Sequence, residues 1–171
     1  MRRLFALALL CTLPARATVV DRVVMVVDDE IILASDVHIE SILSGLDAPP
    51  LPFWTLEHGT GEERLREAAI VRALAAGVQL YEPKPDEVDA RLALVKLRLG
   101  SSWEPLKALT GLDDAAARRL FVRRMVVERY LSRNVPDDPD NPKAWLAACH
   151  DFLEQVQGRY TVRVVAPRGG P

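Results

Sequence analysis

Two short acidic runs of this chain have residue types that can bind divalent cations. The first is Asp-Asp-Glu at 28–30, and the second is 137–141, which has three aspartates and an asparagine beside prolines. The second run lacks the spacing, the glycine and the closing glutamate of an EF-hand loop. We therefore interpret the first run as a hairpin turn with solvated carboxylates and the second as a solvated linker, and we expect no metal site.

Other groups that could do chemistry are isolated along the chain. No zinc-ligand spacing relates the three histidines His38, His58 and His150. Ser35 and Thr60 fit helix N-caps better than nucleophiles, because neither lies in a nucleophile-elbow motif. The sequence also has no glycine loop of the phosphate-binding kind. We expect no catalytic residue and no cofactor.

Four arginines at 118, 119, 123 and 124 could attract an anionic partner. We favour a solvated helix face, with ion pairs to Glu128 and its neighbours.

The first 17 residues are typical of a cleaved export signal. Two arginines precede an apolar run at 4–13, which is far shorter than the roughly 20 residues that span a bilayer, and an Ala-Arg-Ala sequence ends at Ala17. Cleavage after Ala17 would give a periplasmic protein that begins at Thr18. A lipoprotein signal at Cys11 is disfavoured because Leu10 stands where a small residue is needed. A buried N-terminal helix would explain neither the arginines nor the cleavage pattern.

Removal of these 17 residues from 171 leaves 154, a normal size for one domain. Three arginines and no acid leave with the segment, so 19 Lys and Arg remain against 24 Asp and Glu, and the net charge is −5. This acidity argues against nucleic acid or an anionic membrane surface as the main partner. No later apolar run is long enough to span a membrane. Cys149 would be the single remaining cysteine, which excludes an intrachain disulfide.

The run at 21–37, DRVVMVVDDEIILASDV, predicts a hairpin followed by a helix. Apolar, mostly β-branched residues at 23–27 and 31–33 flank the acidic turn, Ser35 offers an N-cap hydroxyl, and Asp36 lies at the positive end of the helix. This run resembles the opening of the mature protein in the SurA N-terminal domain family of periplasmic chaperones.

The rest of the chain reads as helices. Capping-box spacing relates Thr60 to Glu63 and Ser101 to Glu104. The longest helix has apolar residues around much of its circumference, so we expect it to form the centre of the core. The predicted helices span about 36–46, 60–82, 85–99, 101–109, 113–133 and 141–157, and a strand follows at 160–165.

The resemblance to the SurA N-terminal domain family extends more weakly along these helices. In such proteins, parvulin-like prolyl isomerase domains lie between the long helix and a C-terminal helix with its strand. Here a linker of about ten residues takes that place. The resemblance therefore implies a helical chaperone core at 18–135, a linker at 136–142, and a C-terminal helix and strand at 143–171 that complete the same domain, without isomerase domains.

A chaperone of this kind needs adaptable apolar surface for unfolded clients, and methionine and aromatic side chains supply it. The candidate client-binding residues are Phe53, Trp54, Met25, Trp103 and Met125. Ordinary core packing is the alternative for each of them, and it is the stronger one for Met25, Trp103 and Met125, whereas Phe53 and Trp54 lie in a proline-rich loop.

We expect a mainly α (α+β) fold, with a small sheet in which the C-terminal strand pairs with the N-terminal hairpin. The resemblance implies an ATP-independent periplasmic holdase that binds unfolded outer-membrane or secreted proteins and catalyses no reaction. Two alternatives stay open: a dedicated protein-binding or assembly module of the cell envelope, and a residual peptidyl-prolyl cis-trans isomerase.

Overall fold

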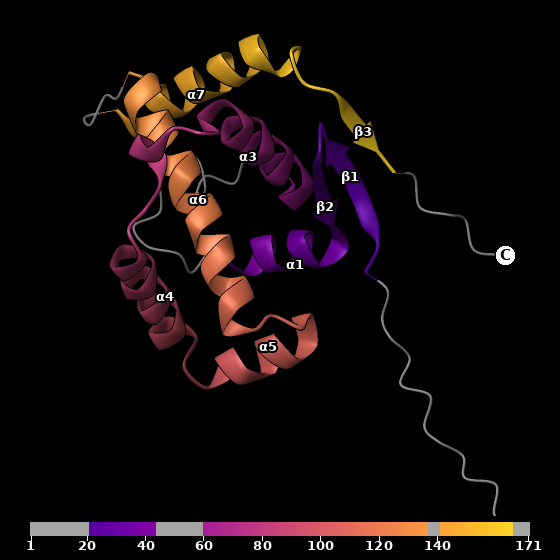
Figure 1. Cartoon of the computed structure of the whole chain (residues 1–171), viewed down its shortest axis with the longest axis vertical. Helices are drawn as coiled ribbons and strands as arrows, with labels where there is room; N and C mark the ends of the chain where they lie inside the picture. The colour runs from indigo at the N-terminus through magenta and orange to yellow at the C-terminus, as the bar shows by residue number, and fades with distance from the viewer. Residues whose placement is uncertain (1–20, 44–59, 137–140, 166–171) are drawn as a thin grey trace, which may run out of the picture.

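The computed structural model describes residues 21–43, 60–136 and 141–165. The chain is mainly helical and carries a three-stranded antiparallel sheet, which confirms the predicted fold class (Figure 1). The strands are β1 (Val23–Val27), β2 (Glu30–Leu33) and β3 (Val162–Val164). The helices are α1 (Ala34–Leu43), α3 (Gly61–Ala75), α4 (Pro85–Leu99), α5 (Trp103–Thr110), α6 (Asp114–Asn134) and α7 (Pro142–Gln157), and two 3₁₀ turns are η1 (Gln79–Tyr81) and η2 (Gly100–Ser102).

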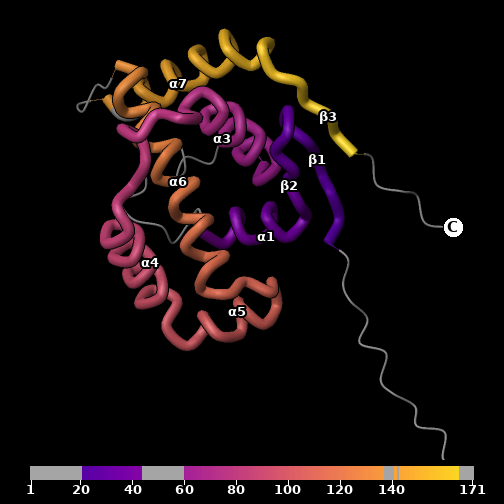
Figure 2. The backbone as a smooth tube through the Cα atoms, in the orientation of Figure 1, coloured from indigo at the N-terminus to yellow at the C-terminus, as the bar shows by residue number. Residues whose placement is uncertain are grey.

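The sheet joins segments from opposite ends of the sequence, as predicted. Its strand order is β2-β1-β3, with β1 antiparallel to both neighbours. Val26 of β1 lies opposite Ile31 on one side and Arg163 on the other. Figure 2 shows the C-terminal strand returning beside the first strand. β1 is therefore the central strand, and β3 forms one edge of the sheet.

The turn between β1 and β2 contains Asp28 in a left-handed conformation, with φ of 48°. Aspartate tolerates this conformation better than most residues because its short polar side chain can bond locally. The Asp28 carboxylate accepts a hydrogen bond of 2.8 Å from the Thr161 backbone N–H, so the turn also holds the start of β3.

Helix α1 begins two residues earlier than the sequence suggests. Ala34 is its first residue, so the predicted N-cap at Ser35 is wrong. The Ser35 hydroxyl instead donates to the Asp21 carboxylate. Asp36 lies in the first turn, as predicted, and its carboxylate accepts a 2.9 Å hydrogen bond from the Leu33 backbone N–H. This bond satisfies one of the donors that a helix start leaves without an intrahelical partner.

The other helix starts follow the sequence signals in most cases. Thr60 and Glu63 form the predicted capping box of α3, and Asp113 and Asn141 cap α6 and α7. The capping box predicted at Ser101 is wrong, because a 3₁₀ turn runs through that residue and α5 begins at Trp103 without a side-chain cap.

Helix α6 crosses the molecule and packs against α3 and α4 (Figure 1). Its C-terminal half, with Val127 and Leu131, joins a core cluster built from β1, β2, α3 and α7. Its N-terminal half, with Ala117 and Phe121, joins a second cluster built from α1, α4 and α5. The expectation that this helix is the centre of the core is thus met, and the core has two parts along it.

No helix in the described ranges is long and apolar enough to cross a membrane. Helix α7 contributes Trp145 and Cys149 to the cluster that contains the N-terminal strand. The short segment 137–140 before α7 lies outside the described residues, as do 1–20, 44–59 and 166–171.

Candidate functional site

The structure places the predicted client-binding residues in different surroundings. Met25 and Trp103 are buried, at 4% and 6% exposure, so their side chains serve core packing. Met125 is half-buried against the second cluster. Phe53 and Trp54 lie outside the described residues. Met25 belongs to one hydrophobic core cluster, whereas Trp103 and Met125 belong to another.

Two lysine ammonium groups nevertheless lie near the ring of Trp103. The Lys96 ammonium lies 5.0 Å from the centre of its ring, and the Lys107 ammonium lies 6.0 Å from it. Cation–π contacts at such distances stabilise an aromatic side chain at the edge of a core. This arrangement explains Trp103 as a structural residue.

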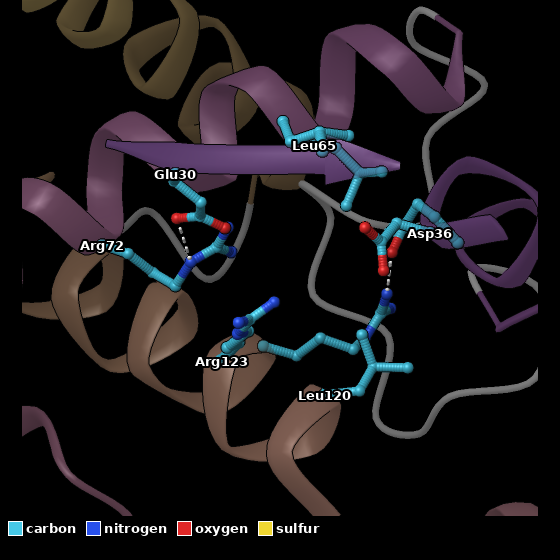
Figure 3. A pocket seen from close by; sticks show the side chains of 9 residues that line it. Glu30, Asp36, Leu65, Arg72, Leu120 and Arg123 are labelled. Carbon is cyan, nitrogen blue, oxygen red and sulfur yellow. Dashed lines mark hydrogen bonds and ion pairs between the residues drawn. The ribbon is translucent and has the colours of Figure 1, made fainter. Parts of the chain in front are cut away.

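A small pocket opens between β2, α1, α3 and α6 (Figure 3). Apolar side chains at its wall are Ile32, Leu65 and Leu120. The charged side chains at its wall are Glu30, Asp36, Glu40, Arg72, Arg123 and Arg124. These residues come from four elements that are distant in sequence, so the fold alone brings them together.

Two ion pairs form opposite parts of this wall. The Arg72 guanidinium donates to the Glu30 carboxylate, with a distance of 3.1 Å from Nε to Oε2. Arg124 and Glu40 are almost fully buried, and the Arg124 guanidinium lies 2.5 Å from Oε2 of Glu40. Arg64 approaches the other oxygen of Glu40 at 3.5 Å. Both pairs tie helices to their neighbours at the pocket.

Glu40 is the more unusual residue of the Glu40–Arg124 pair, because burial disfavours the charged form of its carboxyl. Burial raises the pKa of this carboxyl above its ordinary value, and the neighbouring Arg124 and Arg64 guanidiniums oppose the shift. Along α6, Arg124 lies between Phe121 of one core cluster and Val127 of the other. The buried pair therefore lies where the two parts of the core meet.

Arg123 differs from the other charged groups of the pocket. Its side chain is exposed, and it makes no hydrogen bond or ion pair with any residue that the structure describes. In Figure 3 it extends from α6 into the space between the Glu30–Arg72 pair and Asp36. A guanidinium has five donors in a planar fork, which matches carboxylate geometry.

The prediction of one solvated arginine face on α6 is therefore only partly correct. Arg118 is exposed and pairs with Asp89 at 2.9 Å, but Arg124 is buried with Glu40. Glu128 pairs with Arg91 of α4. The signal for a buried arginine is its spacing, since Arg124 is seven residues from both Ala117 and Leu131, which are fully buried on the same helix.

A second surface with binding potential is the outer edge of β3. Val162 and Val164 lie opposite Val27 and Met25, on the sheet face where those two β1 side chains are buried. The valines are nevertheless 36% and 70% exposed. The helices that cover β1 therefore leave the β3 part of this face uncovered.

The backbone of β3 is also open on its outer side. The Asp28 N–H donates to the Thr161 carbonyl and the Val165 N–H donates to the Val24 carbonyl, each at 2.8 Å. In an antiparallel ladder these bonds alternate, so the N–H and C=O groups of Val162 and Val164 point away from β1. Among the described residues no strand pairs with them. The edge therefore offers free backbone donors and acceptors beside exposed valines.

The described residues contain no group of three or more His, Cys, Asp and Glu side chains that could hold a metal ion. Neither a protein-family model nor a curated protein matches this chain. Candidate functions for the pocket and for the β3 edge must therefore come from their geometry.

Proposed function

We propose that this protein is an ATP-independent periplasmic chaperone, similar to the SurA N-terminal domain family, which binds extended segments of unfolded outer-membrane or secreted proteins and catalyses no reaction. The single observation that supports this proposal most is the open edge of β3, with its exposed Val162 and Val164. An exposed strand edge is a template for pairing with another polypeptide in extended form.

Two contributions to the binding free energy would favour a client at this edge. Main-chain hydrogen bonds to the outward groups of Val162 and Val164 recognise any extended chain, because they do not depend on side chains. Burial of the two valines adds roughly 1–2 kcal/mol at about 25 cal/mol per Å² of apolar area. Ordering of the client opposes both terms, which keeps binding weak and reversible, as a holdase requires.

The strand offers a variant that blocks the outer edge only. Because the Val164 N–H points away from β1, Val164→Pro removes a donor for the client and no bond of the sheet. Val164→Thr is the matched control. Threonine has a shape similar to that of valine, with less apolar surface, and it retains the backbone N–H. Both variants should remain folded, which circular dichroism checks.

The test is fluorescence anisotropy with a labelled, reduced and unfolded polypeptide. We expect Val164→Pro to weaken binding at least fivefold and Val164→Thr to weaken it less than twofold. Equal binding by wild type and a folded Val164→Pro variant would remove β3 from the mechanism. The alanine double variant of Phe53 and Trp54 belongs in the same assay, because the sequence predicts that it too weakens binding.

The enzymatic alternative has a separate test. Prolyl isomerisation has a barrier of about 20 kcal/mol, and parvulin-type enzymes lower it in a dedicated domain. We expect the purified protein not to accelerate cis/trans exchange in a proline-containing peptide. Turnover in that assay would favour a residual isomerase over a holdase.

The proposed compartment also has a direct test. We expect the protein recovered from a periplasmic fraction to begin at Thr18. A cytoplasmic chain that retains Met1 would contradict the export step and, with it, the proposed class of clients.

A further inference from the structure

The pocket between β2, α1, α3 and α6 contains one charged group without a partner in the described part of the chain, Arg123. Glu30 is bound by Arg72, and Glu40 is bound by Arg124. The Asp36 carboxylate accepts from the backbone at the start of α1. The donors of Arg123 are therefore available for a hydrogen bond, and they are directed into this space (Figure 3).

The charges around the pocket leave a positive excess. Three carboxylates, those of Glu30, Asp36 and Glu40, meet the three arginines of the pocket wall, and Arg64 adds a fourth guanidinium at Glu40. With every group ionised, the local charge is +1. Arg119, one helical turn before Arg123, is exposed on the same side of α6 and adds to the positive potential.

The remaining wall is apolar. Ile32 and Leu65 are buried at 2% and 7% exposure, and Leu120 is half-buried. Low-polarity neighbours strengthen a charge-assisted hydrogen bond relative to one in water. Leu120 offers most of the accessible apolar surface, so a ligand that fits both parts of the wall has an anionic group for Arg123 and an apolar group that packs against Leu120.

We propose that this pocket binds a carboxylate of a polypeptide, next to an apolar side chain, through the guanidinium of Arg123. The identification of the ligand as a polypeptide rests on the proposed function. The preference for a carboxylate next to an apolar group rests on the pocket alone. Two sources offer this group: the C-terminal carboxylate of a chain that ends in an aliphatic residue, and an Asp or Glu side chain beside one. The pocket would thus give the protein a preference among the segments that its open sheet edge accepts.

The probe for a direct test is N-acetyl-leucine, which combines a carboxylate with an aliphatic side chain. N-acetyl-leucinamide is its neutral counterpart of nearly equal size. NMR of the purified protein would follow the Nε–Hε signal of Arg123 and the methyl signals of Leu65 and Leu120. We expect saturable shifts with a millimolar dissociation constant for the acid, and at least fivefold weaker shifts for the amide.

Two variants of α6 locate the interaction. Arg123→Gln should abolish the response of the leucine methyls to N-acetyl-leucine. Arg133→Gln is the control, because Arg133 is exposed on the same helix but does not line the pocket. Equal responses to acid and amide, no response to either, or an unchanged response in Arg123→Gln would each overturn the proposal.

Peptides then distinguish the two sources. A peptide with a C-terminal Leu carboxylate is compared with its amide, and a peptide with an internal Asp-Leu pair is compared with Asn-Leu. Loss of affinity in the first comparison assigns the C-terminus, and loss in the second assigns the side chain. Equal affinity in both comparisons would contradict a polypeptide carboxylate as ligand. Since the N-acetyl-leucine experiment uses no unfolded client, it fails independently of the proposed chaperone function.

Discussion

The buried pair of Glu40 and Arg124 provides the most informative perturbation of this fold. Both side chains are nearly inaccessible, at 1% and 2% exposure, and each neutralises the other. Arg124→Met leaves the Glu40 carboxylate buried with only the more distant Arg64 to compensate it. Breaking a buried pair in this way typically costs about 3–5 kcal/mol, and we expect the lower end, about 3 kcal/mol, because Arg64 remains.

The other single variant should have a similar effect. Glu40→Leu removes the carboxylate that balances a guanidinium held in the core, and we again expect about 3 kcal/mol. In the double variant no buried charge of the pair remains, and two apolar side chains of related volume extend the contact between the core clusters. Arg64, with 12% of its side chain exposed, can turn toward solvent. The double variant should therefore lose only about 1–2 kcal/mol, less than either single variant.

Urea unfolding followed by circular dichroism measures all four proteins, with the slope of the transition as the check for unchanged compactness. The matched control is the exposed pair of Lys96 and Asp114, which lie 3.1 Å apart with 32% and 60% of their side chains exposed. The double-mutant cycle of this exposed pair should give a coupling free energy of less than about 1 kcal/mol. Single variants of Glu40 and Arg124 that cost under 1 kcal/mol and add without coupling would refute the reasoning.

Three further outcomes test the local structure. Deletion of 159–171 removes β3, exposes the edge of β1 and should lower the free energy of unfolding by about 2–4 kcal/mol in urea titration, with increased aggregation; unchanged stability would contradict the strand pairing. Asp113→Ala removes the side-chain acceptor for the Ala116 N–H, 2.6 Å away, and should lower stability by about 1 kcal/mol, whereas Asp113→Asn should retain most of it. The pKa of Glu63 is lowered chiefly by the hydrogen bond from the Thr60 backbone N–H. The contribution of this carboxylate to stability is therefore fully present above its usual pKa of 4.5, and it is lost as the pH falls through the lower pKa of the folded state. Glu63→Gln should therefore make the loss of melting temperature between pH 5 and pH 3 shallower than in wild type, and an identical pH profile would speak against the capping box.

Elements with strong local signals were predictable from the sequence. The hairpin has β-branched runs on both sides of an acidic turn, and the N-caps Thr60, Asp113 and Asn141 each precede an apolar periodic segment. The starts of α1 and α5 were less predictable, because a serine before a helix can bond elsewhere. Ser35 bonds to Asp21, a residue fourteen positions earlier, and such a partner has no local signature.

Most of the candidate site could not be predicted from the sequence. The pocket unites residues of β2, α1, α3 and α6, and the pair of Glu40 and Arg124 is separated by 84 positions. Local periodicity indicates that each charged residue shares a face with buried apolar neighbours, but it does not identify the partner. The exposure of β3 likewise depends on where the helices end over the sheet, which is a property of the packing.

The most direct test of the central proposal is a survey of aggregation by light scattering. Several unrelated proteins, unfolded in urea, are diluted into buffer without ATP, with and without the purified protein. We expect aggregation of most of them to fall as the protein approaches an equimolar amount, and the effect to diminish in Val164→Pro. Undiminished aggregation of every client, or protection of one specific partner alone, would contradict a general holdase, and the second result would favour an assembly module.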